Sequence, residues 1–197
     1  MPAVPRHRQP IVNAAVALFR QQGYTGTGVA DIADESGAPR GSLYHYFPDG
    51  KSAIAAAAIA EAGQRVAATL GALASELPTT ADLLRAHARL LAGWMRESGF
   101  RDGCPITSVL LELAPEDRTV RAAGRKAYAT RIGILRNKLV ADGFPPPRAD
   151  RLAVLCASAL QGALIQARTE RNGAAIETTA DELARMLEAA RVRDGGA

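Results

Sequence analysis

The chain has 197 residues, of which 48% are hydrophobic and 5% aromatic, and its 24 basic and 20 acidic side chains leave a formal net charge of +4. This length accommodates one large domain or two small ones with a sizeable core, and so mild a charge does not by itself indicate a nucleic-acid partner. The two cysteines, Cys104 and Cys156, lie far apart without a C-x-x-C pair, which argues against a zinc site or a disulfide framework. We therefore expect reduced thiols in a cytoplasmic protein, with neither a metal nor a cofactor.

Hydrophobic patterning favours an all-α fold. β-branched residues are scattered and never alternate over the length of a strand, whereas Ala and Leu recur at helical spacing. No uninterrupted apolar run reaches about 20 residues, which argues against a membrane partner. Arg6 and Arg8 before the run IVNAAVALF imitate a signal peptide, but Asn13 interrupts that run and FRQQ is no small-residue cleavage site.

The first predicted elements are a Pro/Arg-rich arm over residues 1–9 and an amphipathic helix over residues 11–22 that ends at Gly23. Charge does not mark this region as a nucleic-acid binder. Residues 1–51 hold five basic side chains (Arg6, Arg8, Arg20, Arg40, Lys51) and four acidic ones (Asp31, Asp34, Glu35, Asp49). Binding would therefore depend on the placement of a few groups.

Two short helices joined by a tight turn are predicted between Thr27 and Lys51. Thr27 is a plausible N-cap of the first, VADIADES, because its hydroxyl can accept a free backbone N–H. Gly37 supplies the corner, since glycine enters the positive-φ region without strain, and Pro39 suits the first turn of the next helix.

The second short helix has a buried stripe and a polar surface. Leu43 and Phe47, four residues apart, form the stripe. The remaining faces are rich in hydrogen-bond donors and poor in acids, as a nucleic-acid reader requires, and they hold Arg40, Ser42, Tyr44, His45 and Tyr46.

These residues carry a resemblance to a known family. The ordered set of Ile32-Ala33, Gly37 and RGSLYHYF over residues 40–47 resembles the helix-turn-helix of TetR-family transcriptional regulators. The pattern extends back to Phe19, Gly23-Tyr24 and Thr27 and forward to Lys51, about a quarter of the chain. The family usually has Phe-x-x-Lys after the recognition helix, whereas Phe47-Pro48-Asp49-Gly50-Lys51 has one extra residue. That insertion, together with Gly103-Cys104-Pro105, resembles the LmrA/YxaF-like subgroup.

The resemblance implies a division into two domains. Residues 1–50 would form a three-helix DNA-binding domain with a helix-turn-helix, and residues 51–197 a helical ligand-binding and dimerisation domain, with about nine helices in all. It implies a homodimer on a double-stranded DNA operator and a small-molecule effector. The expected DNA-binding residues, with Lys51 on a phosphate, are Thr27, Arg40, Gly41, Ser42, Tyr44, His45, Tyr46 and Lys51.

The rest of the chain is predicted to consist of longer helices. They cover residues 51–77, a helix capped by Thr79 and Asp82, a short helix from Pro105, residues 116–142, a helix from Pro145-Pro146-Pro147, and a last helix after a capping box of Thr179 and Glu182.

The last two helices are the predicted dimer interface. The helix after the proline cluster is apolar nearly all round and must be covered on two sides, which favours a four-helix bundle with a second copy. An ordinary monomeric core is the alternative. The interface residues expected are Leu152, Leu155, Cys156, Ala159, Ala163, Leu183, Met186 and Leu187.

A ligand pocket in the body is implied by the resemblance alone, and each of its residues could equally serve only in packing. The expected lining is Trp94, Met95, Phe100, Cys104, Ile106, Leu110, Leu113, Tyr128 and Leu160, with Gln161 or Arg168 as a polar anchor. Such a lining favours a flat apolar or aromatic molecule. His87 is expected to be a core or boundary histidine.

The function implied is that of a repressor which binds a palindromic operator as a dimer and leaves it when an effector binds. An activator or a ligand-independent regulator of the same fold remains open. An enzyme is disfavoured, because His7, His45 and His87 have no acidic or nucleophilic partners in an ordered motif.

Overall fold

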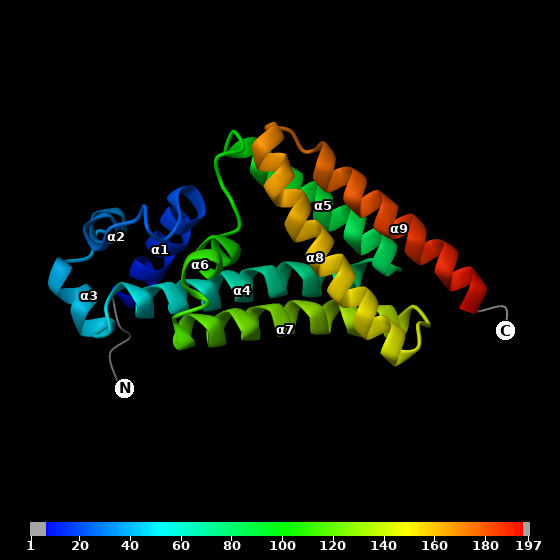
Figure 1. Ribbon diagram of the computed structural model, residues 1–197, viewed down its shortest axis with the longest axis horizontal. Helices are drawn as coiled ribbons and strands as arrows, with labels where there is room; N and C mark the ends of the chain where they lie inside the picture. The colour runs from blue at the N-terminus through cyan, green and yellow to red at the C-terminus, as the bar shows by residue number, and fades with distance from the viewer. Residues whose placement is uncertain (1–6, 195–197) are drawn as a thin grey trace. The chain divides into compact units, whose positions relative to one another are not determined.

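The computed structural model describes the backbone of residues 7–194 and the side chains of residues 7–191. Over that range the chain forms α-helices and no strand, as the sequence predicts (Figure 1). The nine helices are α1 (Arg8–Gln22), α2 (Val29–Ser36), α3 (Arg40–Tyr46), α4 (Lys51–Glu76), α5 (Thr80–Glu97), α6 (Pro105–Leu113), α7 (Arg118–Ala141), α8 (Pro146–Glu170) and α9 (Ala174–Asp194).

The chain divides into two compact units, each with its own hydrophobic core. In the described range the first unit comprises residues 7–65 and 103–128, and the second comprises residues 66–102 and 129–194. The division falls within α4 and α7, so each of these helices contributes its N-terminal part to the first unit and its C-terminal part to the second.

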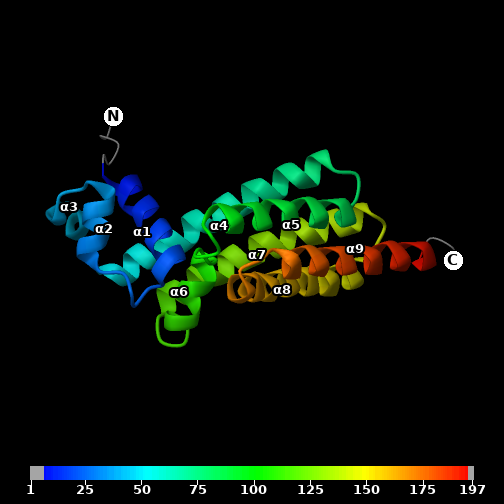
Figure 2. The ribbon, with the colours of Figure 1, turned by 90° about the horizontal axis from the view of Figure 1, so that it is seen from above.

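The first unit is built around α1, which contacts α2, α3 and α6 (Figure 2). Its apolar residues recur at helical spacing, so Ile11, Ala15 and Phe19 form one fully buried stripe. Ile32 of α2 and Leu43 of α3 belong to the same core, so the two short helices are held by side chains that α1 supplies.

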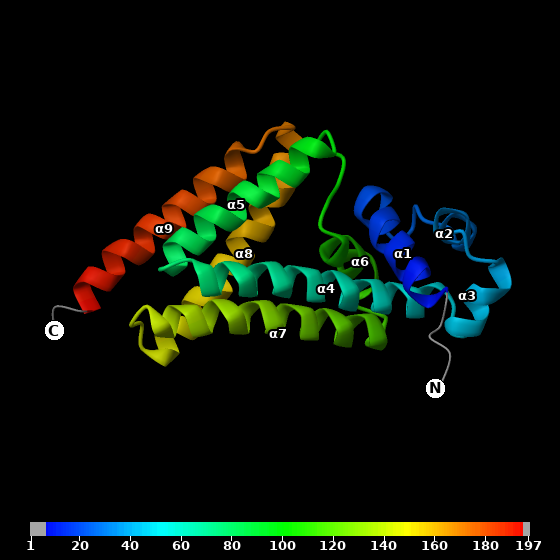
Figure 3. The same cartoon turned by 180° about the vertical axis from the view of Figure 1, so that it is seen from behind.

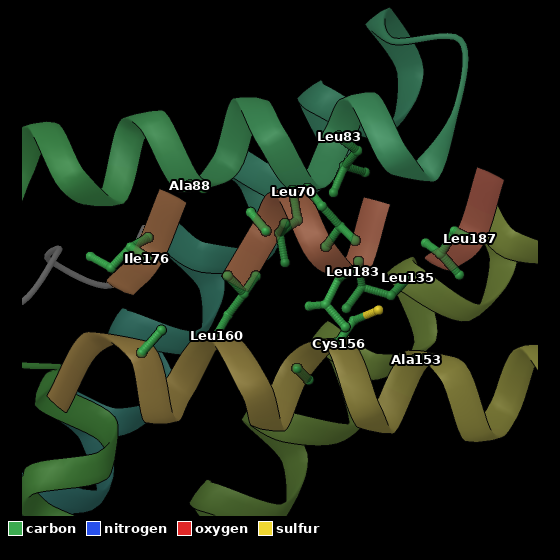
Figure 4. Packing of buried hydrophobic residues seen from close by; sticks show 14 of the residues in the cluster. Leu70, Leu83, Ala88, Leu135, Ala153, Cys156, Leu160, Ile176, Leu183 and Leu187 are labelled. Carbon is green, nitrogen blue, oxygen red and sulfur yellow. The ribbon is translucent and has the colours of Figure 1, made fainter. Parts of the chain in front are cut away.

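The second unit consists of α5, α8 and α9 together with the C-terminal parts of α4 and α7. Helix α5 runs along α9 (Figure 3), and Arg85 of α5 forms ion pairs with Asp181 and Glu188 of α9. Leucines and alanines from all five helices fill its core (Figure 4). By length and composition alone, helix α8 could cross a membrane. This is weak evidence for a membrane span, because seven of its residues lie in the core of the second unit.

The structure confirms one of the three predicted helix caps, at Thr79, and contradicts the other two, at Thr27 and Thr179. Thr79 accepts a hydrogen bond from the amide of Asp82 at 3.1 Å, as expected. Helix α1 begins at Arg8, so the end of the predicted arm is helical; residues 1–6 lie outside the described range. The capping box at Thr179 is wrong, because α9 already begins at Ala174, whose amide donates to Asn172 Oδ1 at 3.0 Å.

Candidate nucleic-acid interface

A tight turn joins α2 to α3, and its backbone explains its sequence. Gly37 ends α2 in the left-handed region, at φ 62° and ψ 16°, and a Cβ there would meet no atom within 4 Å. Glycine is therefore required by conformation and not by crowding. Ala38 is buried behind the turn, and Pro39 is the N-cap of α3. The predicted helix-turn-helix is present.

Helix α3 separates an inner from an outer face as predicted. Leu43 and the following Phe47 are buried against the core of the first unit. On the other faces Tyr44 is 61% exposed, Arg40, Gly41 and His45 are exposed, and Ser42 and Tyr46 are half-buried. The structure thus brings six of the eight predicted DNA-binding residues together on one short helix.

Gly41 has open space around it. A Cβ built on Gly41 would meet no atom within 4 Å, and its φ is not in the left-handed region. Neither packing nor backbone conformation within the chain requires a glycine here. A glycine on an exposed helix face fits the close approach of another backbone, such as a DNA strand.

Thr27 does not behave as predicted. It is 0% exposed, and its hydroxyl donates to the carbonyl of Gly23 at 2.7 Å instead of capping α2. The N-cap is Gly28, whose amide donates to Asp31 Oδ2 at 2.6 Å. Because a Thr before a helix and an Asp three residues into it are both capping signals, the sequence alone placed the cap one residue early. A fully buried side chain cannot contact DNA, so Thr27 is not part of the exposed surface that α3 presents.

Lys51 is the first residue of α4 and is half-buried. Its Nζ lies 3.9 Å from the centroid of the Tyr24 ring, a cation–π contact. Burial lowers the pKa of Lys51, although the carboxylates of Glu112 and Asp31 act in the opposite direction. Lys51 is therefore engaged within the first unit, beside the loop that connects α1 and α2.

Glu112 of α6 is a component of this region that the sequence analysis missed. Its Oε1 accepts a hydrogen bond from the amide of Tyr24 at 2.8 Å. Its Oε2 accepts hydrogen bonds from the amide of Thr25, at 2.7 Å, and from the Thr25 hydroxyl. Burial acts to raise the pKa of Glu112, but these hydrogen bonds and the charge of Lys51 outweigh it and lower the pKa. We call this arrangement the Glu112 clamp. No local pattern could reveal it, because the partners lie 87 and 88 residues apart.

Asp117 forms a second link of the same kind. It caps α7 by accepting the amides of Thr119 and Val120 at 2.8 and 2.9 Å. It also accepts the hydroxyl of Ser52, in the first turn of α4. The Ser52 hydrogen bond and then the Val120 amide lower the pKa of Asp117, so it stays ionised at neutral pH. The corner between α6 and α7 is thus tied to the start of α4.

The predicted ligand residues fall into two separately packed groups. Cys104, Ile106, Leu110, Leu113 and Tyr128 belong to the first unit, where the Tyr128 and Thr107 hydroxyls lie 3.1 Å apart. Trp94, Met95, Phe100, Leu160, Gln161 and Arg168 belong to the second. There Met95 and Leu160 are core residues, whereas Trp94 is 45% exposed and Arg168 is exposed.

Gln161 is half-buried and contacts one of two buried basic residues of the second unit, Arg131 of α7 and His87 of α5. The Oε1 atom of Gln161 accepts a hydrogen bond from Nη1 of Arg131 at 3.2 Å, and Arg131 is buried. His87 of α5 is 3% exposed, and burial followed by the charge of Arg131 lowers its pKa to about 4. His87 is therefore a neutral core histidine, as expected. The side chains in the described range include no group of three or more metal-binding residues.

Half of the predicted dimer residues are core residues of the second unit, which corrects that prediction. Cys156, Leu183 and Leu187 (Figure 4) and Ala163 are buried within the chain, so they cannot form a surface for a second copy. Of the remaining predicted residues, Leu155 and Met186 are exposed, while Leu152 and Ala159 are half-buried. The sequence could not separate the two apolar faces of α8 because they are almost equally hydrophobic.

Two family models match the chain. Residues 11–58, which include α2 and α3, match the bacterial regulatory proteins of the tetR family. Residues 80–182, just over half of the chain, match the C-terminal domain of LmrA/YxaF-like transcriptional regulators.

Relatives and solved structures agree with these matches. An uncharacterized HTH-type transcriptional regulator of Mycobacterium tuberculosis, MT0206, is 35% identical over 91% of this chain and 93% of its own length. The HTH-type transcriptional regulator LmrA of Bacillus subtilis is 28% identical over 84% of this chain and 88% of its own.

Among solved structures, a TetR transcriptional regulator from Legionella pneumophila has the same fold, with a TM-score of 0.81 and 18% identity over 93% of this chain and 98% of that one. The regulator FadR from Bacillus subtilis, solved in complex with stearoyl-CoA, has a TM-score of 0.67 at 18% identity over 91% of this chain and 96% of that one. The relatives are regulators of transcription, which confirms the expectation that the protein is not an enzyme. The chain thus belongs to the TetR family of DNA-binding transcriptional regulators, with a C-terminal domain of the LmrA/YxaF-like type.

Proposed function

We propose that the protein is a cytoplasmic, ligand-responsive repressor that binds a palindromic operator as a homodimer and is released by a small lipophilic or aromatic effector. The observation that carries the proposal is the outer face of α3. There Arg40, Gly41, Tyr44 and His45 are exposed while Leu43 anchors the helix from behind.

On the operator, α3 enters the major groove as the second helix of a helix-turn-helix. Arg40 and Ser42, near its N-terminus, reach phosphates or base edges. Tyr44, with Tyr46 or His45, contacts the sugar-phosphate backbone, and Lys51 holds a phosphate. The sequence-independent affinity for DNA is small, because this surface has few basic side chains that could release counterions from the phosphates.

The homodimer forms through the outward faces of α8 and α9. Val154, Leu155 and Ile165 of α8 and Met186 of α9 are large, apolar and exposed, and small residues between them on α8, Ser158 and Gly162, are exposed as well. Exposed apolar surface of this kind marks contact sites, and small residues allow close helix approach. The two copies of α3 in a dimer then bind half-sites about 34–36 Å apart. The dimer thus reads more base pairs than one short helix can read alone.

The effector binds in the body and is mainly apolar, with one polar group. The Arg131–Gln161 pair and neutral His87 place hydrogen-bonding groups beside the apolar core of the second unit, which suits one oxygen on a lipophilic molecule. A lipophilic effector also agrees with the LmrA/YxaF-like domain match and with the acyl-CoA in the FadR structure.

Effector binding favours a dimer that misfits the operator. Helix α4 extends from the first unit into the second, so a change in the second unit that displaces α4 alters the position of its N-terminus beside α3. The effector acts only through its higher affinity for the misfitting form.

The test is a gel shift with the intergenic DNA upstream of the protein's own gene, with and without flavonoids, aromatic dyes and acyl-CoA. A sequence-specific shift that such a compound abolishes is the expected result. The variants Arg40→Ala and Tyr44→Ala, with unchanged helical circular dichroism, should each lose at least about fivefold in operator affinity, since a good base contact contributes about 1–3 kcal/mol. Unchanged affinity in both variants would exclude α3 as the reading surface. A shift that all compounds leave intact would point to a ligand-independent regulator.

A further inference from the structure

Helix α6 is attached at both ends to the segment that leads into the helix-turn-helix. Two residues before α6 begins, the amide of Gly103 donates to the carbonyl of Arg20, in the last turn of α1, at 2.8 Å. At its end the Glu112 clamp holds Tyr24 and Thr25. Between these points Ile106 and Val109 are buried in the core of the first unit. Helix α6 therefore packs along the end of α1 and the loop that follows, and hydrogen bonds hold it there at both ends.

Two glycines lie close to side chains of α6. A Cβ on Gly23 would lie 2.7 Å from Glu112 Oε1, and Gly23 has a φ of +76°. On the opposite side of α6, a Cβ on Gly124 of α7 would lie 2.5 Å from Leu110 Cδ2. A side chain at either position would have to displace Glu112 or Leu110, so the two glycines make room for these side chains of α6.

The clamped loop, residues 23–28, fixes the start of α2, in addition to the core contacts that hold α2 and α3 on α1. It connects α1 to α2, and its far end is fixed by the Thr27 hydroxyl on Gly23 and by Asp31 on Gly28. Lys51 of α4 lies on the ring of Tyr24, so the loop is held by α6 through Glu112 and by α4 through Lys51.

We infer that Glu112 is a positioning residue for operator binding, through which a displacement of α6 reaches the reading helix directly. The inference rests on the proposed function, because it concerns how the operator-binding form is held. The amide–carboxylate distances of 2.7 and 2.8 Å exceed hydrogen-bond range after a displacement of about 1 Å. Such a displacement releases the loop and lets α2 and α3 reorient.

Charge provides a sharp test. Glu112→Gln removes an acid from the DNA-binding unit, so electrostatics alone would tighten binding to DNA. The clamp makes the opposite prediction, because an amide NH2 cannot accept the hydrogen bonds that one carboxylate oxygen now accepts. Glu116→Gln makes the same change of charge at an exposed residue three positions beyond the end of α6 and is the matched control.

The experiment measures, for wild type and the variants Glu112→Gln, Glu112→Ala and Glu116→Gln, the Kd for the upstream DNA segment that wild type protects and for unrelated DNA. Amide hydrogen exchange at Tyr24 and Thr25 is followed in the same proteins, well below each Tm. We expect operator Kd to rise about tenfold or more in Glu112→Ala and less in Glu112→Gln. Affinity for unrelated DNA should be unchanged or tighter, and exchange should accelerate at both amides. A variant that was merely less folded would lose affinity for both DNAs.

Two results would overturn the inference in different ways. If wild type protects a segment and Glu112→Gln binds it as Glu116→Gln does, the clamp does not position the reading helix, although the proposed function stands. If wild type protects no segment of DNA, the proposed function fails and the inference falls with it.

Discussion

The ammonium nitrogen of Lys51 lies 3.9 Å from the centroid of the Tyr24 ring, so the first residue of α4 rests on the loop that leads into the helix-turn-helix. The sequence contains one residue more than the family norm between Phe47 and Lys51. Despite that insertion, Lys51 lies directly beside the loop, and the ring fixes the direction of its side chain. A lysine held this way loses little side-chain freedom when it binds a phosphate.

Lys51→Met should therefore change the salt dependence of operator binding. If each Lys51 of a dimer holds one phosphate, the slope of log K against log salt becomes shallower by about 1.8, because each lost phosphate contact accounts for about 0.9. The free energy of unfolding should also fall, by about 0.5–1 kcal/mol, through loss of the cation–π contact. Fluorescence anisotropy at several salt concentrations and urea unfolding measure the two effects. A variant that loses stability yet keeps the full slope would restrict Lys51 to an internal role.

Gly41→Ala should separate stability from DNA binding. Because a Cβ at Gly41 meets nothing within 4 Å, the change should stabilise the protein by about 0.5–1 kcal/mol, the usual gain for Gly→Ala within a helix. On the operator the added methyl lies where DNA approaches, so affinity should fall even as Tm rises. Gly133→Ala, at an equally open helical position in α7, is the control and should raise Tm without changing affinity. Equal affinity of the two variants would show that DNA keeps clear of Gly41.

Many features governed by near neighbours in sequence could be predicted, as the helix-turn-helix shows, although the predicted caps at Thr27 and Thr179 are wrong. The turn at Gly37, the buried pair Leu43 and Phe47, and the Thr79 cap all depend on residues within four positions of one another. Such contacts follow from helix periodicity and from capping chemistry, both of which can be read from a short window of sequence.

Contacts between distant segments could not be predicted. Nothing near Glu112 indicates that it binds Tyr24 and Thr25, and nothing near Asp117 indicates that it accepts the hydroxyl of Ser52. The prediction of which face of α8 is buried within the chain was wrong for a different reason. When a helix such as α8 is apolar nearly all round, periodicity cannot tell the face that packs within the chain from the face left for a partner.

That distinction predicts opposite outcomes for two leucines of the last two helices. Leu155→Glu places a charge on the exposed face of α8 and should yield a folded monomer with weak operator binding. Leu187→Glu places the charge in the core of the second unit and should unfold it. Sedimentation velocity and circular dichroism distinguish the two. Leu90→Glu, at an exposed leucine of α5, is the control and should remain a folded dimer. A Leu155→Glu protein that still sediments as a dimer would place the interface elsewhere.

His87 should make the second unit sensitive to mild acid. Burial, reinforced by the charge of Arg131, lowers its pKa from 6.5 to about 4, so the unfolded chain binds the proton more readily than the folded one. The resulting stability is fully present above pH 6.5 and is lost as the pH falls from 6.5 to 4. A shift of this size corresponds to about 3 kcal/mol. Urea unfolding at pH 7 and pH 5 should show about half of this loss, since carboxylates such as Glu112, whose pKa is lowered from 4.5, titrate mainly below pH 5. In His87→Gln the loss between pH 7 and pH 5 should largely disappear, even if the variant is less stable at both. An unchanged pH dependence in that variant would show that His87 is not the group responsible.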